Sequence, residues 1–190
     1  RYDVIINTLL RDANESPAKH AFSDYLKEKY IDISKLNQAW NTEIANWEAL
    51  YESAKLASIS ADVEQDLSTM LERLSDRYFK VVHDTLETAL PNHLYMGARM
   101  ANFGMPKETI KASVTYSDVL SFNIYEEGVQ EKEWSFLNEI DLPTVIGEFH
   151  IGATKETGLF HPGFVQTDDQ KDRGEMYQRY MESVARHKNM

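Results

Sequence analysis

Cysteine is absent from this 190-residue chain, and basic residues and long apolar runs are scarce. Without cysteine, disulfides, thiolate chemistry and a cysteine-built zinc site are excluded. No apolar run approaches the length of a membrane span. Lys and Arg number 20 against 31 Asp and Glu, which gives a net charge of −11. Because nucleic acid and anionic membrane surfaces repel an acidic protein, we expect neither as a partner, and neutral or cationic ligands stay open.

Glycine is missing from residues 1–90, and this half has the pattern of a helical scaffold. Helices are predicted over 16–30, where a serine precedes a proline at the first helical position, and over 41–57. A third helix is predicted over 61–90, because apolar residues recur there at steps of three and four until Pro91.

The second half alternates between two kinds of pattern. Short apolar, β-rich segments predict strands over 93–100, 119–125 and 144–150. Between and after them, helical patterns occupy 106–113, 129–140 and 170–188. The order βαβαβα predicts an α/β fold whose parallel strands are joined by right-handed helical crossovers.

Polar residues gather at the carboxyl ends of these strands, which is where parallel α/β proteins build their sites. Simple alternation along 144–150 places Glu148 on the face of Thr144, Ile146 and His150. The same alternation gives one face to Ser121, Asn123 and Tyr125, and one face to Tyr95, Gly97 and Arg99. We therefore expect Arg99, Asn123, Tyr125 and Glu148 to converge.

Structural roles would also explain these residues. A glutamate at a strand end is often a capping or salt-bridge residue, and Arg99 could simply neutralise Glu148. Asn123 and Tyr125 could satisfy backbone groups of loops.

The two histidines of the following loop, His150 and His161, could likewise be ordinary hydrogen-bonded residues. Eleven residues apart, they are a weak metal signal. We expect neither a metal ion nor a cofactor.

Several stretches resemble the β-agarases of glycoside hydrolase family 50. "DLPTVIGEFHIGATKETGLFHPGFV" (141–165) is similar to the nucleophile strand and the loop that follows it. "LYMGARMA" (94–101) and "DVLSFNIYEEGV" (118–129) resemble the two preceding strands. "SPAKHAFSDYLKEKYIDISKLNQAWNT" (16–42) resembles the helical stretch after the acid/base strand, and retaining β-galactosidases of the same clan have a similar run.

The resemblance implies a (β/α)8 barrel of which this chain holds only part. Residues 1–90 would be the helical segment after the fourth strand, and residues 91–190 would supply strands five to seven of one catalytic domain. The family's acid/base glutamate follows an asparagine at the end of the fourth strand, and that motif is not found in 1–190. Glu15 lies too far into the helical region to replace it.

The implied reaction is retaining hydrolysis of the β-1,4 galactosidic linkages of agarose, with Glu148 as nucleophile and the acid/base outside this chain. Retaining enzymes hold two carboxylates about 5–5.5 Å apart, one as nucleophile and one as acid and base. By resemblance Tyr125 donates a hydrogen bond to Glu148, and Arg99, Asn123, His150 and His161 are candidate substrate-binding residues. Phe160 and Phe164 could pack against sugar rings or belong to the core of the loop.

Two alternatives stay open, a retaining β-galactosidase-like enzyme and a non-catalytic fragment when the chain is isolated. The expected partners are a neutral galactan, agarose or its oligosaccharides, and the remainder of the barrel. The family resemblance implies a secreted or periplasmic bacterial protein. Because strands five to seven alone would leave open sheet edges, we expect the chain not to fold independently.

Overall fold

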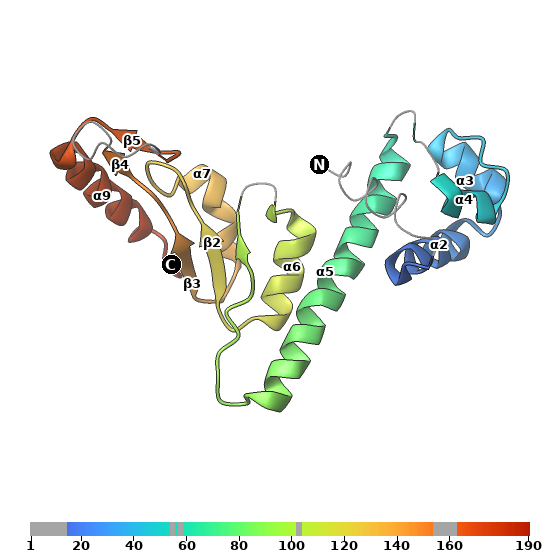
Figure 1. Cartoon of the computed structure of the whole chain (residues 1–190), viewed down its shortest axis with the longest axis horizontal. Coiled ribbons are helices and arrows are strands. Elements are labelled where there is room, and N and C mark those ends of the chain that lie inside the picture. The colour runs from blue at the N-terminus through green and yellow to red at the C-terminus, as the bar shows by residue number, and fades with distance from the viewer. Residues whose placement is uncertain (1–14, 54–55, 57–58, 102–103, 154–162) are drawn as a thin grey trace. The chain divides into compact units, whose positions relative to one another are not determined.

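The computed structural model describes residues 15–53, 56, 59–101, 104–153 and 163–190. The chain divides into two compact units, Arg1–Tyr78 and Phe79–Met190. Figure 1 shows the helices and strands of both units with their labels.

The described part of the first unit is helical. Its elements are α2 (Pro17–Tyr30), α3 (Ile33–Trp40), α4 (Trp47–Ser53) and the first part of α5 (Ala61–Ala89). Ser16 has the extended backbone of an N-cap and Pro17 opens α2, as the sequence predicted. The Asp32 side chain accepts a hydrogen bond from the Ser34 amide and so caps α3, which ends at Asn41 in the left-handed region.

The core of the first unit closes around one buried carboxylate, Asp66 of α5. Among the described residues, its buried apolar side chains are Phe22, Leu26, Leu36, Trp40, Leu50, Val63, Leu67 and Met70. Among them Asp66 is 0% exposed. The Tyr25 hydroxyl and the Lys29 ammonium donate to its Oδ1, at 2.7 and 2.6 Å. The Tyr30 hydroxyl and the Trp40 indole donate to its Oδ2, at 2.7 and 2.8 Å. These four donors tie α2 and α3 to α5, which satisfies a charge that would otherwise be costly to bury.

The second unit is built on a three-stranded parallel sheet in the order β1-β2-β3. The strands are β1 (Arg99–Met100), β2 (Leu120–Asn123) and β3 (Thr144–Glu148), and Figure 1 shows them side by side. The crossovers contain α6 (Lys107–Tyr116) and then α7 (Glu131–Trp134) with the 3-10 helix η2 (Ser135–Glu139). This is the predicted alternation of parallel strands and helices.

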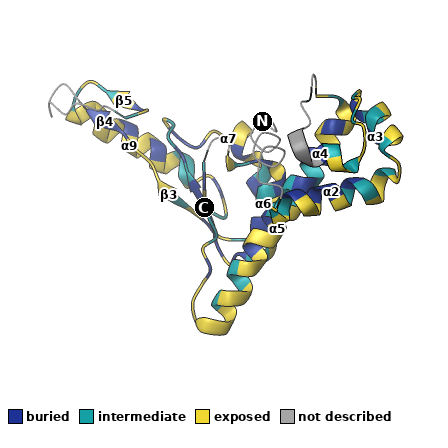
Figure 2. Ribbon diagram, turned by 45° about the vertical axis from the view of Figure 1, so that its right-hand side comes forward, coloured by how far each residue is buried: buried dark blue, intermediate teal, exposed yellow. Residues whose placement is uncertain are grey.

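The chain ends in a second small sheet and a helix. Strands β4 (Gly152–Ala153) and β5 (Gln166–Thr167) pair in parallel, and α9 (Gln170–Val184) follows them. Asp169 caps α9 by accepting from the Asp172 amide at 2.9 Å. Met176 and Tyr180 are buried on α9, and most of its other residues are exposed (Figure 2).

The middle strand places one face in the core and leaves the other for polar side chains. Leu120 and Phe122 are buried with Trp134 and Leu137. The residue between them, Ser121, and then Asn123 take the opposite face, because side chains alternate along a strand. Ile146 of β3 also packs on this core.

Several predicted element bounds were wrong. The strand predicted over 93–100 is formed only at Arg99–Met100, and the helix predicted over 41–57 is described only at Trp47–Ser53. Sequence reasoning missed α3, β4 and β5. Among the described helices, none combines the length and the apolar character needed to cross a lipid bilayer.

Candidate functional site

The Glu148 carboxylate lies at the carboxyl end of β3 and accepts three side-chain hydrogen bonds. The Tyr125 hydroxyl donates to Oε1. The Arg99 guanidinium donates to Oε2 at 3.1 Å, and the Asn123 amide donates to the same oxygen at 3.3 Å. Arg99 is the first residue of β1, Asn123 is the last residue of β2, and Tyr125 lies two residues further on. The convergence predicted from the sequence is therefore present. The Glu148 side chain is nevertheless 46% exposed, which leaves it open to a ligand.

The face that Glu148 occupies differs from the prediction. β2 and β3 pair in regular register from Leu120↔Thr144 to Phe122↔Ile146, but the next pair is Asn123↔Glu148. Gly147 is therefore an extra residue in β3, a β-bulge. Simple alternation gave Glu148 the face of Thr144 and Ile146. The bulge turns it to the opposite face, where its register partner Asn123 lies.

Hydrogen bonding to an anion changes the properties of Tyr125. The hydrogen bond to Glu148 raises the pKa of the Tyr125 phenol, and its loss of water contact and the nearby negative charge act in the same direction. A tyrosine phenol is protonated at neutral pH in any case, and the raised pKa extends its range as a donor into alkaline solution. Together with the Arg99 cation, the phenol gives Glu148 the donors that an ionised carboxylate prefers.

Helix α9 fixes the ends of both strands that carry this site. The Tyr180 hydroxyl donates to the carbonyl of Ile124 at 3.1 Å, one residue before Tyr125. The Tyr180 ring stacks on Phe149, the residue after Glu148, with centroids 5.0 Å apart. Burial raises the pKa of Tyr180 to about 12, so this donor is also neutral at ordinary pH. Tyr180 thus holds the neighbours of Tyr125 and Glu148 together.

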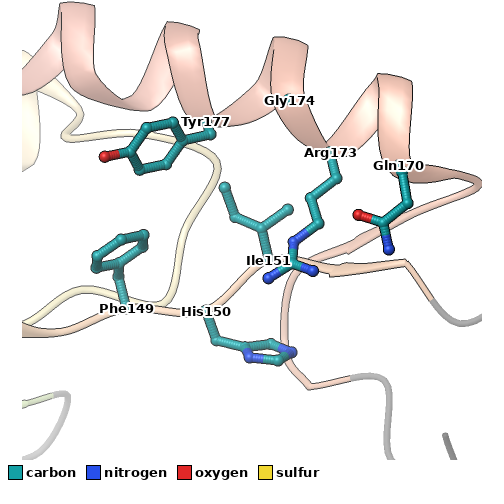
Figure 3. A pocket seen from close by; sticks show the side chains of 7 residues that line it. All are labelled: Phe149, His150, Ile151, Gln170, Arg173, Gly174 and Tyr177. Atoms are coloured by element: carbon teal, nitrogen blue, oxygen red, sulfur yellow. The ribbon is translucent and has the colours of Figure 1, made fainter. Parts of the chain in front are cut away.

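His150 lines a pocket of about 420 Å³ between the end of β3 and the start of α9. Figure 3 shows the lining residues, which are Phe149, His150, Ile151, Gln170, Arg173, Gly174 and Tyr177. The His150 ring lies against the backbone of Gly163, whose φ of +80° and lack of a side chain make that approach possible. His161 and Phe160 lie outside the described residues.

An aromatic side chain stands beside the carboxylate. Phe164 is 79% exposed, and its ring centroid is 5.3 Å from that of Tyr125. This exposure argues against burial of Phe164 in a loop core, and its packing against a sugar ring stays a prediction. No group of three or more potential metal ligands occurs within the part of the chain that the structure describes.

The chain has close relatives among characterised proteins, although no family model matches it. Beta-agarase B of Vibrio sp. (strain JT0107) is 44% identical over 186 residues, and beta-agarase A of the same organism is 37% identical over 192. Each match covers 97% of this chain and 19% of the relative, so the chain spans about a fifth of the curated proteins it matches.

Solved structures agree with these relatives. The structure of an exo-beta-agarase matches with a TM-score of 0.89 and 44% identity, over 96% of this chain and 25% of that one. The agarase AgWH50C matches with a TM-score of 0.87 and 43% identity, and PfGH50B matches with a TM-score of 0.86 and 44% identity. Each of these matches covers 96% of this chain and 26% of the other. The chain corresponds to part of a glycoside hydrolase family 50 agarase domain.

Two features of this partial agarase domain were missed by sequence reasoning. The bulge at Gly147 was missed because alternation assumes an unbroken register. A glycine one residue before a polar strand end was the available signal, since an isolated glycine in a strand often marks a bulge. Tyr180 was missed because the sequence pattern predicted only a helix over 170–188 and singled out no residue on it.

Proposed function

We propose that this chain carries the nucleophile side of the active site of a retaining β-agarase, with Glu148 as the nucleophile. The observation that carries the proposal is the Glu148 carboxylate, held by Tyr125, Arg99 and Asn123 at the end of a parallel strand and still open to solvent. The match to β-agarases over 97% of the chain supports the reaction class.

The geometry supports attack by a fixed, ionised carboxylate. Glu148 attacks the anomeric carbon, and the bond to the leaving sugar oxygen breaks as that oxygen takes a proton from the acid/base residue. Water then attacks the glycosyl-enzyme ester with the same residue acting as base, which releases the sugar and frees Glu148. Because Tyr125 and Arg99 bind different carboxylate oxygens, rotation of the carboxylate is restrained, and an oriented nucleophile lowers the entropic cost of attack.

The second carboxylate is proposed to lie outside residues 1–190, after an asparagine at the end of an upstream strand. The three parallel strands with helical crossovers support their placement as strands five to seven of a (β/α)8 barrel. The rest of that barrel would come from a longer chain or from a second polypeptide. When isolated, residues 1–190 are then expected to be a non-catalytic fragment.

The proposed substrate is a neutral galactan, agarose or its oligosaccharides, cut at β-1,4 linkages outside the cell or in the periplasm. A net charge of −11 does not repel such a polymer. Phe164 offers an exposed ring next to Tyr125 on which a sugar face can pack. We assign Arg99 and Asn123 to the same subsite, with His150 and His161 further along the following loop.

The test is Glu148→Gln in the full-length enzyme, assayed on agarose. The amide is nearly isosteric but cannot act as a nucleophile, so turnover should fall on the order of 10⁴-fold or more, with unchanged melting. Glu127→Gln, an exposed glutamate two residues after Tyr125, is the matched control and should keep full activity. Retained turnover in Glu148→Gln refutes the assignment.

Substrate choice and the role of the rest of the barrel need separate assays. Faster hydrolysis of a nitrophenyl galactoside than of agarose by the full-length enzyme would favour the β-galactosidase alternative. Purified residues 1–190 should show no agarose hydrolysis and no sharp cooperative melt. Measurable hydrolysis by this piece would place the acid/base within it.

A further inference from the structure

Gly147 occupies a position where the chain must both change register and leave room for another side chain. It is the extra residue of the bulge between the pairs Phe122↔Ile146 and Asn123↔Glu148. A Cβ built on Gly147 would lie 2.7 Å from the Ser121 hydroxyl and 2.8 Å from Cδ of Arg99. Contacts this short do not occur in folded proteins, so one of the neighbours would have to move.

The two neighbours differ in how easily they can move. The Ser121 hydroxyl can turn to another staggered rotamer. Cδ of Arg99 lies in the middle of its side chain, and a Cβ at 147 would also approach Cγ to 3.2 Å. Moving this part of the arginine moves the guanidinium, whose Nη1 is 3.1 Å from Glu148 Oε2. The side chain of Arg99 therefore reaches Glu148 across the space that Gly147 leaves empty.

We propose that Gly147 is a positioning residue for the reaction, acting through the bulge that aims Glu148 and through the passage it leaves for Arg99. If Gly147 instead paired with Asn123 in regular register, alternation would turn Glu148 toward the core face that Ile146 shares. With any side chain at 147, Arg99 is displaced from the carboxylate. This inference rests on the proposed role of Glu148 as nucleophile.

Backbone conformation does not explain why residue 147 is a glycine. Gly97 and Gly163 have φ of +60° and +80°, which disfavour other residues on backbone grounds. Gly147 does not have a positive φ, so its backbone alone does not exclude alanine. Because the Ser121 hydroxyl can turn away, the Arg99 side chain is what excludes a side chain at 147. The requirement for glycine should therefore disappear when Arg99 is shortened.

The test is a double-mutant cycle in the full-length enzyme with Gly147→Ala, Arg99→Ala and the combined variant. Gly147→Ala should lower kcat about tenfold to a hundredfold, the scale of a small misplacement of a reacting group, with little change in KM. In the Arg99→Ala background it should cost no more than about twofold further, because the clash with Arg99 is gone and the Ser121 hydroxyl can turn away. Additive losses would overturn the proposal. Gly104→Ala is the control, since a Cβ there meets no atom of the described part of the chain within 4 Å.

Melting of the same variants keeps the proposal testable if Gly147→Ala folds poorly. The combined variant should then recover the melting temperature of Arg99→Ala, and failure to recover it would count against the Arg99 passage. Full kcat in Gly147→Ala would also overturn the inference. If Glu148→Gln stays active, the proposed function itself has failed, whereas an inactive Glu148→Gln with an additive cycle removes only the role of Gly147.

Discussion

Asp66 and Glu148 are two carboxylates with similar partners and opposite surroundings. Each accepts hydrogen bonds from a cation and a tyrosine, Lys29 and Tyr25 at Asp66, and Arg99 and Tyr125 at Glu148. Asp66 has four donors and is 0% exposed, while the Glu148 side chain has three donors and is 46% exposed. A saturated, buried carboxylate holds helices together, and a fixed but accessible one can react. The type of partner alone does not tell a structural carboxylate from a catalytic one.

Removing Asp66 should have the largest effect on stability. Asp66→Ala leaves the Tyr25, Tyr30 and Trp40 donors without their acceptor and removes the counter-charge of Lys29. Lys29 is 34% exposed and can regain water, so most of the cost comes from the donors left unsatisfied, about 1–3 kcal/mol for a buried one. The first unit should therefore unfold well before the rest. Urea unfolding of the full-length protein, monitored by limited proteolytic cleavage within α2, measures the stability of the first unit. Glu64→Ala, an exposed change one half-turn away on α5, should cost less than about 1 kcal/mol.

High pH should disrupt the hydrogen bonds that Asp66 accepts. Burial and the hydrogen bond to Asp66 raise the pKa of Tyr30 from 10.0 to about 12. Burial lowers the pKa of Lys29, but the hydrogen bond and charge of Asp66 outweigh it and raise that pKa overall. Between pH 10 and 12 the unfolded chain loses the Tyr30 proton first, so the stability present below pH 10 declines as pH rises through this window.

Far-ultraviolet circular dichroism against pH tests the alkaline loss. Helix signal should fall between pH 10 and 12, the fall should be smaller in Tyr30→Phe, and Tyr125→Phe should not change it. A helix signal that stays level past pH 12 would show that the Asp66 donors do not hold the first unit together.

Arg99 should show the reverse balance, a small effect on stability and a larger one on catalysis. Its side chain is 60% exposed, and exposed ion pairs contribute about 0–1 kcal/mol to folding. Arg99→Ala should therefore melt like the wild type, while kcat falls about tenfold to a hundredfold because Glu148 loses one of its orienting donors. Steady-state kinetics measures the change in kcat, and calorimetry on the same preparation measures the change in stability. A large loss of stability with unchanged kcat would make Arg99 a structural partner like Lys29.

Sequence patterns predicted the features of the fold and of the Glu148 site that follow local rules. The order of strands and helices, the long α5 and the gathering of Arg99, Asn123, Tyr125 and Glu148 at strand ends came from periodicity and parity. The register shift at Gly147 did not, because a bulge depends on pairing between two strands. The face of the strand predicted for Glu148 was therefore wrong, although its predicted partners were correct.

The Asp66 centre was missed for a different reason. Its donors lie 26 to 41 residues away in the sequence and meet only after α2, α3 and α5 pack. A signal existed, since Asp66 falls on the apolar stripe of α5 three residues after Val63 and four before Met70. An acidic residue on such a stripe indicates a buried, partnered carboxylate, although the sequence does not say which donors will reach it.

Covalent trapping tests the central claim, that Glu148 is the accessible nucleophile, most directly. The full-length enzyme would be incubated with an activated 2-fluoro-galactoside, digested and sequenced by mass spectrometry. One glycosyl ester is expected on Glu148 and none on Asp66, and the adduct should be absent from Glu148→Gln. An adduct on another carboxylate, or one that still forms in Glu148→Gln, would contradict the claim.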